Sequence, residues 1–220
     1  FITDDNSLWK GQSLYELYST AYTPWEWHEP IMRRAHDLGM VCISTPFDET
    51  AVDFLEDLDV PAYKIASPEI VHLPLIKRVA ATGKPMIIST GMASVAEIDD
   101  AVRTIRSEGC SQFVLLKCVS AYPASPKDSN VLTIPNMREL FDCEVGLSDH
   151  TMGIGVAIAA VAHGATVIEK HFTLRRADGG VDAAFSLEPA EMEQLVIETE
   201  RAFLALGKAQ YGPTEAEKGS

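Results

Sequence analysis

The chain has 220 residues, enough for one ordinary domain with a substantial core. Its hydrophobic content of 46% and its mean hydropathy near zero are typical of a soluble globular protein, and no apolar run is long enough to span a membrane. The net charge of −14 argues against nucleic acid as the main partner, because phosphate contacts need clustered lysine and arginine. The four cysteines lack metal-motif spacing, so we expect reduced thiols in a cytoplasmic protein.

The first 27 residues stand apart from the rest of the chain. Residues 1–11 are polar and show no periodicity, whereas residues 21–30 bring together two tryptophans, a tyrosine and a histidine. Such an aromatic segment suits a lid over a site, where rings could stack on a sugar, or a plug packed against the side of the domain.

Residues 28–208 repeat a pattern of short apolar strand, polar loop and amphipathic helix. The predicted strands are rich in valine, isoleucine and leucine without alternation, which is typical of parallel strands covered on both faces. They span residues 40–45, 62–67, 85–90, 113–120, 144–148 and 166–172. Helices are predicted at residues 28–38, 50–58, 73–82, 135–141 and 153–163.

Two further helices carry clear local signals. Ser94-Val95-Ala96-Glu97 is a capping box, in which a serine oxygen and a glutamate carboxylate satisfy free N–H groups at a helix start. The last helix ends near Gly207, and its predicted apolar face consists of Met192, Leu195, Val196, Phe203 and Leu206.

Six strand–helix units favour a (β/α)8 barrel, the TIM barrel, which needs eight such units. An open doubly wound sheet is the alternative, but its usual glycine-rich nucleotide fingerprint is missing. We therefore predict a partial barrel over residues 28–208, with the first two strands absent from this chain. Residues 209–220 resemble the start of a linker, and we expect the chain to be a piece of a longer protein.

Two histidines close neighbouring predicted strands, in Ser148-Asp149-His150 and Glu169-Lys170-His171. Adjacent barrel strands end at the same rim, so the imidazoles of His150 and His171 should lie side by side. Paired imidazoles could hold one divalent metal ion, although a lone histidine is more often a packing residue.

Other polar residues at strand ends allow two interpretations each. Lys64 lies inside a strand, where an ammonium is costly unless it pairs with a neighbouring carboxylate or clamps an anionic ligand. Asp182 could bind substrate hydroxyls or could simply favour a turn.

Taken together, these strand ends closely resemble the sialic acid synthase family. The resemblance covers about residues 14 to 215, and the matching segments occur in family order. They are Ile43-Ser44-Thr45-Pro46-Phe47, Tyr63-Lys64-Ile65-Ala66-Ser67-Pro68-Glu69, Ile88-Ser89-Thr90-Gly91-Met92, Gly146-Leu147-Ser148-Asp149-His150 and Glu169-Lys170-His171-Phe172-Thr173. Within the family, residues 23–28 and 180–186 look most like pseudaminic acid synthases.

The resemblance implies a (β/α)8 barrel that condenses phosphoenolpyruvate with an N-acetylated hexose in its aldehyde form. It implies a divalent cation, typically Mn²⁺, held by His150 and His171. Glu69 would handle protons with Lys64 beside it, and Asp182 would bind sugar hydroxyls. The residues that would hold phosphoenolpyruvate are Lys64, Thr45, Ser67, Ser89, Ser148 and Lys170.

The family also implies a homodimer, because its C-terminal antifreeze-like domain reaches into the partner subunit's site. Neither that domain nor the family's first barrel strands are present in this chain. Two alternatives therefore stay open. One is a synthase of the neuraminate or legionaminate branch, and the other is an inactive barrel that binds carbohydrate or metal.

Overall fold

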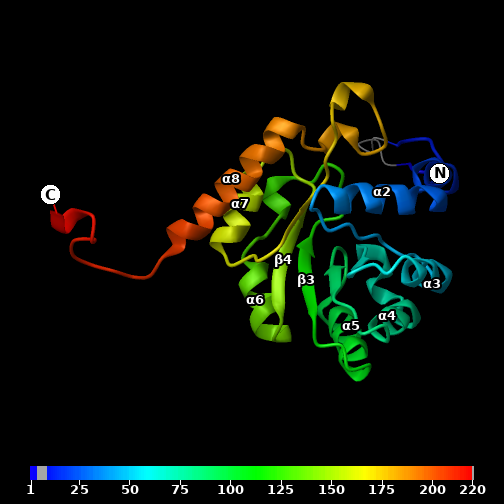
Figure 1. The fold of residues 1–220 in the computed structure, drawn as a ribbon, viewed down its shortest axis with the longest axis horizontal. Helices are drawn as coiled ribbons and strands as arrows, with labels where there is room; N and C mark the ends of the chain where they lie inside the picture. The colour runs from blue at the N-terminus through cyan, green and yellow to red at the C-terminus, as the bar shows by residue number, and fades with distance from the viewer. Residues whose placement is uncertain (4–8, 220) are drawn as a thin grey trace.

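The computed structural model describes residues 1–3 and 9–219, and its centre is a curved parallel sheet (Figure 1). Within the described residues the sheet has five strands in the order β1-β2-β3-β4-β5, the order in which they follow one another along the chain. The strands are β1 Tyr63–Ile65, β2 Met86–Ser89, β3 Phe113–Cys118, β4 Glu144–Asp149 and β5 Ile168–Lys170. This arrangement confirms an α/β fold that forms a half-barrel; two additional strands before Phe1 stay a prediction.

Eight α-helices in the described residues surround or extend from this sheet. They are α1 Leu14–Ala21, α2 Trp25–Asp37, α3 Glu49–Asp57, α4 Leu73–Ala80, α5 Val95–Ser107, α6 Thr133–Phe141, α7 Gly155–Ala162 and α8 Pro189–Leu206. The capping box at α5 is confirmed, since the Ser94 side chain accepts from the Glu97 N–H and the Glu97 carboxylate accepts from the Ser94 N–H. None of the described helices is long and apolar enough to cross a membrane.

The core lies between one face of the sheet and the helices that follow its strands. Strand residues such as Ile65, Ile88 and Leu115 are fully buried there against Ile76 and Ile105 of the helices. We call this helix-covered side the outer face of the sheet and the opposite side the inner face. Because side chains alternate along a strand, every second strand residue points to the inner face.

The expected strand at residues 40–45 was wrong in extent. Only Ser44 forms a β-bridge, with Tyr63, and Val41 is 80% exposed. Within the described residues this segment has a neighbouring strand on one side only, so most of its backbone groups lack a ladder partner.

The expected helix at residues 28–38 begins three residues earlier, at Trp25, after Pro24 as its N-cap. The Trp25 ring stacks on Phe54 of α3 with centroids 4.5 Å apart, and His28 meets the same ring edge-on. His28 Nε2 also lies 3.1 Å from Ser44 Oγ. These contacts favour the plug over the lid.

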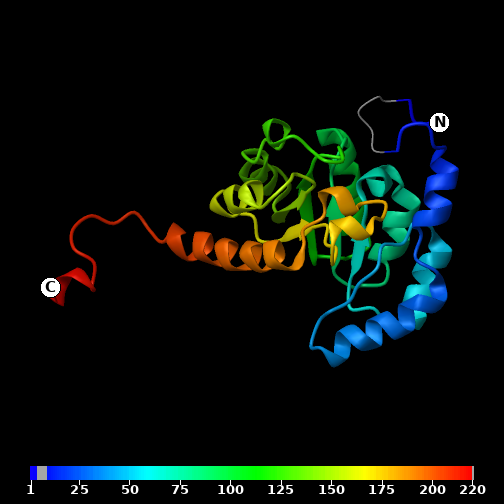
Figure 2. The ribbon, with the colours of Figure 1, turned by 90° about the horizontal axis from the view of Figure 1, so that it is seen from above.

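The expected apolar face of the last helix packs only in part. Leu195 is buried and Met192 packs against the core, but Val196, Phe203 and Leu206 are exposed. Both views show α8 running outward from the domain, with the C-terminal tail beyond it (Figures 1 and 2). The outer half of α8 therefore has no described part of the chain to bury its apolar residues.

Candidate functional site

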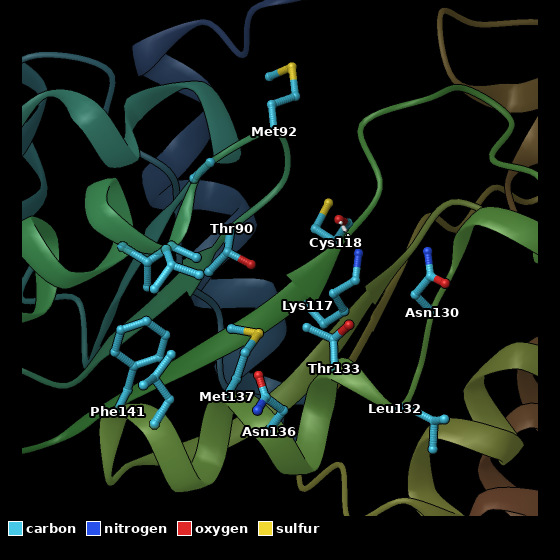
Figure 3. Close-up of a pocket in the computed structure, with 14 residues that line it drawn as sticks. Thr90, Met92, Lys117, Cys118, Asn130, Leu132, Thr133, Asn136, Met137 and Phe141 are labelled. Carbon is cyan, nitrogen blue, oxygen red and sulfur yellow. Dashed lines mark hydrogen bonds between the residues drawn. The ribbon is translucent and has the colours of Figure 1, made fainter.

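A cavity of about 380 Å³ lies at the C-terminal ends of the strands, on the inner face of the sheet. The parallel register brings Ser89 opposite Leu116, Cys118 opposite Ser148, and Ser148 opposite Glu169, so these residues share one face. Eight of the ten predicted site residues line this cavity: Thr45, Lys64, Ser67, Ser89, Ser148, His150, Lys170 and His171. A larger cavity lies on the outer face of the sheet (Figure 3), but the predicted site residues do not converge there.

Lys64 is the buried cation of the inner cavity. Its ammonium donates hydrogen bonds to Ser89 Oγ at 2.8 Å and to the Ile65 carbonyl at 2.7 Å, and it lies 3.6 Å from Glu169 Oε2. Burial lowers the pKa of Lys64, and the nearby Glu169 carboxylate partly offsets this effect. The structure therefore shows the pairing with a carboxylate and places Lys64 in the cavity lining, and its contact with an anionic ligand stays a prediction.

Hydroxyl groups surround this ammonium. Ser148 Oγ donates to Glu169 Oε1 at 2.6 Å, and Ser67 Oγ accepts from the Gly91 N–H at 3.0 Å. The loop after β2 approaches the cavity so closely that a Cβ on Gly91 would lie 2.2 Å from Ser120 Oγ. A side chain at this position would push the Ser120 and Ser67 hydroxyls aside, so glycine lets Ser67 keep its place in the cavity lining.

The two predicted metal ligands do lie side by side. The rings of His150 and His171 have centroids 5.2 Å apart. His150 Nδ1 lies 2.8 Å from the Val119 carbonyl, which can only accept, so this nitrogen carries the proton and Nε2 is left as the free lone pair. His171 Nδ1 lies 3.4 Å from Asp182 Oδ2, the kind of carboxylate contact that orients a metal-binding imidazole through its other nitrogen.

These residues supply part of a metal site. Among residues 1–3 and 9–219, no group of three or more histidine, cysteine, aspartate or glutamate side chains is arranged to hold a metal ion. Two oriented imidazoles with free Nε2 atoms fit a divalent cation whose other positions are filled by water and substrate oxygens. Asp182 is absent from the cavity lining and acts on it through His171.

Two predicted residues differ from the others in position: Glu69 lies outside the cavity lining, and Lys170 lines the cavity while its ammonium is bound elsewhere. Glu69 does not line it; one carboxylate oxygen is buried with no hydrogen-bond partner among the described residues, and burial raises the pKa of Glu69. The Lys170 ammonium bonds Asp149 Oδ2 at 2.8 Å and the Thr151 carbonyl. Lys170 pairs in register with Asp149, not with Ser148, which places this ion pair on the outer face.

The loop after β5 is fixed by an arginine. A bridge between Phe172 and Leu187 closes the loop, and the Arg176 guanidinium binds both carboxylate oxygens of Glu191 at the start of α8. Arg176 also donates to the Ser186 carbonyl at 2.9 Å. These contacts hold Asp182 and its neighbours against His171.

Comparison with known proteins gives matches that cover nearly the whole chain, including the cavity residues. Residues 2–211 match the NeuB family model. The chain belongs to the NeuB family. It is 42% identical over 214 residues to the pseudaminic acid synthase of Helicobacter pylori, covering 96% of this chain and 63% of that protein. It is 39% identical to an N,N'-diacetyllegionaminic acid synthase of Campylobacter jejuni, covering 87% and 58% respectively.

The solved structure of N-acetylneuraminic acid synthetase from Leptospira borgpetersenii, in complex with citrate, superposes on this NeuB-family chain with a TM-score of 0.87. The two are 35% identical, and the match covers 93% of this chain and 71% of that one. The chain spans less than two thirds of the length of the first curated relatives that it matches.

Sequence reasoning missed three ionisable cavity residues of this NeuB-family chain: Glu169, Cys118 and Tyr122. Burial raises the pKa of the Cys118 thiol, but interactions with His150 and Ser67 outweigh it and bring the pKa down to about 7. The Tyr122 ring packs 4.4 Å from the ring of His150. Strand alternation could have assigned Cys118 and Glu169 to the inner face, because each has the same parity as a predicted site residue.

Proposed function

We propose that the complete protein condenses phosphoenolpyruvate with an N-acetylated amino-sugar aldehyde, giving a nonulosonic acid, most specifically pseudaminic acid, and inorganic phosphate. The observation that carries this proposal is the inner cavity, where one buried ammonium, serine hydroxyls and two oriented imidazoles converge in an otherwise acidic chain. Membership of the NeuB family and the pseudaminic acid synthases among its relatives support it.

The proposed phosphoenolpyruvate site is centred on Lys64. Its ammonium already holds Ser89 Oγ, and Ser67, Ser148 and Thr45 add hydroxyls around it. An ammonium in a partly dehydrated cavity forms strong charge-assisted contacts with phosphate and carboxylate oxygens. This set would fix the enol carbon in one orientation toward the sugar aldehyde.

Proton handling falls to carboxylates near that ammonium. The enol carbon forms the new C–C bond with the aldehyde carbon, water adds to the resulting oxocarbenium carbon, and phosphate leaves with C–O cleavage. Glu169 lines the cavity and Glu69 has a raised pKa, so we propose that both take part in moving the protons of the water and the new hydroxyl.

His150 and His171 are proposed to hold a divalent cation, Mn²⁺ in the family, through their Nε2 atoms. When bound, the cation supplies Lewis-acid polarisation of the aldehyde oxygen. The chain's own contribution is orientation: Val119 and Asp182 fix the two rings, and Phe185 packs 4.9 Å from the ring of His171.

The choice of sugar rests on the loop after β5. Asp182 is followed by Ala183, Ala184 and Phe185, and Phe185 is buried beside the histidines. An apolar segment packed beside His171 suits the 6-deoxy, diacetamido precursor of pseudaminic acid better than the more polar N-acetylmannosamine. Apolar pockets reject an extra hydroxyl weakly, by roughly a hundredfold, so some turnover of other sugars is expected.

The test gives the complete protein phosphoenolpyruvate, Mn²⁺ and one candidate hexose at a time, and measures phosphate release. The expected substrate is 2,4-diacetamido-2,4,6-trideoxy-altrose. A preference for N-acetylmannosamine or for the legionaminate precursor would refute the sugar assignment alone. No phosphate release with any sugar would refute the proposed synthase activity and favour an inactive barrel that binds carbohydrate or metal.

The metal assignment has its own measurement. His150→Ala and His171→Ala should each abolish activity and stoichiometric Mn²⁺ binding, measured by elemental analysis, without lowering the unfolding temperature by more than a few degrees. Full metal content with full activity in either variant would show that these histidines only pack. We also propose a homodimer in the cytoplasm, in keeping with the family and with four free thiols.

A further inference from the structure

A second cavity, of about 630 Å³, lies on the outer face of the sheet between β3 and the helices α5 and α6 (Figure 3). Its volume is in the range of small-molecule sites. It shares only one lining residue, Cys118, with the inner cavity. The reaction proposed above uses none of its other residues.

One uncompensated cation, Lys117, lines this outer cavity. Its ammonium donates to the Cys118 carbonyl at 3.0 Å, and it forms no ion pair within the part of the chain that the structure describes. Lys170 also belongs to the outer face, but there Asp149 neutralises it at 2.8 Å. Burial lowers the pKa of Lys117. The fold therefore keeps a half-buried ammonium with no acid beside it, at an energetic cost that an anion in the cavity would offset.

The other side chains around Lys117 are neutral. Thr133 and Asn136, on α6, have side chains with no hydrogen-bond partner among the described residues, and Asn130 lies across from the ammonium. In Figure 3, Lys117, Thr133 and Asn130 gather at one end of the cavity, and Phe141 lies at the other. These groups can bond hydroxyl and amide oxygens but add no charge.

The remaining walls are apolar and open to solvent. Met92, Val95 and Leu132 are all exposed and line the cavity. A ligand with methyl groups would cover this surface.

We propose that the outer cavity binds a singly charged, N-acylated sugar acid, with its carboxylate on Lys117. A single cation matches one carboxylate better than a phosphate monoester, which carries nearly two charges. Hydroxyl groups of the ligand would meet Thr133, Asn130 and Asn136, and acetamido methyls would meet the apolar wall. The ligand class rests on the proposed function, because its product belongs to this class.

A ligand here would contact the ends of two catalytic-site strands. Thr90 lines the outer cavity and directly follows Ser89, which accepts from Lys64, while Cys118 lines both cavities. Thr90 is fixed to the next strand by two hydrogen bonds of 3.0 Å to the Leu116 carbonyl. Because Lys64 and Ser89 do not line the outer cavity, a sugar acid bound there should not compete with phosphoenolpyruvate.

The experiment measures binding of N-acetylneuraminic acid to the complete protein by calorimetry, with phosphoenolpyruvate saturating and no sugar aldehyde present. One equivalent should bind. Lys117→Met should weaken binding at least tenfold, and Lys117→Arg should retain part of it. The matched control is Lys127→Met, which removes the same charge from an exposed lysine in the connection between β3 and α6.

The proposal is overturned if no sugar acid binds beside saturating phosphoenolpyruvate, or if Lys117→Met binds as the wild type does. Equal weakening in Lys127→Met would mean that only net charge matters. Displacement of N-acetylneuraminic acid by an equal concentration of inorganic phosphate would mean that the cavity binds anions in general and does not recognise the sugar acid. None of these outcomes depends on turnover, so failure here is separable from failure of the phosphate-release assay.

Discussion

Replacing Lys170 by methionine tests whether this lysine holds the fold or the substrate. Its ammonium and the Asp149 carboxylate are 2.8 Å apart, with side chains only 2% and 1% exposed. Asp149 also accepts from the Thr151 N–H and hydroxyl, so the carboxylate is held in place. In the Lys170→Met variant, Asp149 would stay buried without its counter-charge.

The magnitude follows from this burial. Removing one partner of a buried ion pair costs about 3–5 kcal/mol, because the remaining charge is uncompensated. For a domain of 150–250 residues, each kcal/mol lowers the unfolding temperature by about 2–4 °C. The variant should therefore unfold roughly 6–20 °C below the wild type.

The assay is thermal unfolding by circular dichroism at neutral pH, together with the Michaelis constant for phosphoenolpyruvate. Lys117→Met is the matched control: the same substitution on the same face of β3, which β4 separates from β5, removes an ammonium without an acid partner, so its unfolding temperature should stay equal or rise. Adding Asp149→Asn to Lys170→Met should recover part of the lost stability. An unchanged unfolding temperature with a much higher Michaelis constant would refute the structural role and support a contact with phosphoenolpyruvate.

Three further outcomes are expected. Lys64→Met should raise the Michaelis constant for phosphoenolpyruvate at least about tenfold, since charge-assisted hydrogen bonds contribute about 1.5–3 kcal/mol; an unchanged constant with activity retained would leave Lys64 only its ion pair with Glu169. Arg176→Ala should raise the Michaelis constant for the sugar by about tenfold, because the loop after β5 loses its anchor to α8. The control Arg175→Ala removes an exposed arginine from the same loop and should leave this constant unchanged. Equal effects of the two substitutions would rule out the anchor. Burial raises the pKa of Glu69, so this carboxyl group binds a proton more readily in the folded protein than in the unfolded chain. Protonated Glu69 therefore favours the folded state, and this stabilisation is lost as pH rises through the folded-state pKa. Glu69→Gln should therefore unfold at a higher temperature than the wild type at pH 8, with the difference vanishing below about pH 4; a variant that is less stable at pH 8 would contradict this sign.

Signals that act over a few residues were readable in the sequence. The capping box Ser94–Glu97 specified the start of α5, because both of its hydrogen bonds close within one turn. Uninterrupted apolar runs specified the parallel strands, and the polar residues after them were correctly expected to meet at one rim, where eight of the ten predicted residues line one cavity. The motifs at this rim also indicated the protein family, which the match over residues 2–211 confirms.

What the sequence could not decide was which partner each charged side chain would find. Lys64, Lys117 and Lys170 all lie at strand positions, yet Lys64 pairs with Glu169 in the inner cavity, Lys117 lines the outer cavity without an acid, and Lys170 is neutralised by Asp149. Their fates depend on strand register and on side chains 21 or more residues away, as with Lys170 and Asp149. The same holds for residues 40–45 and the outer half of α8, whose apolar patterns form a strand or a buried face only where a neighbouring element covers them. Periodicity states what a segment can bury, and only the tertiary structure supplies the surface against which it is buried.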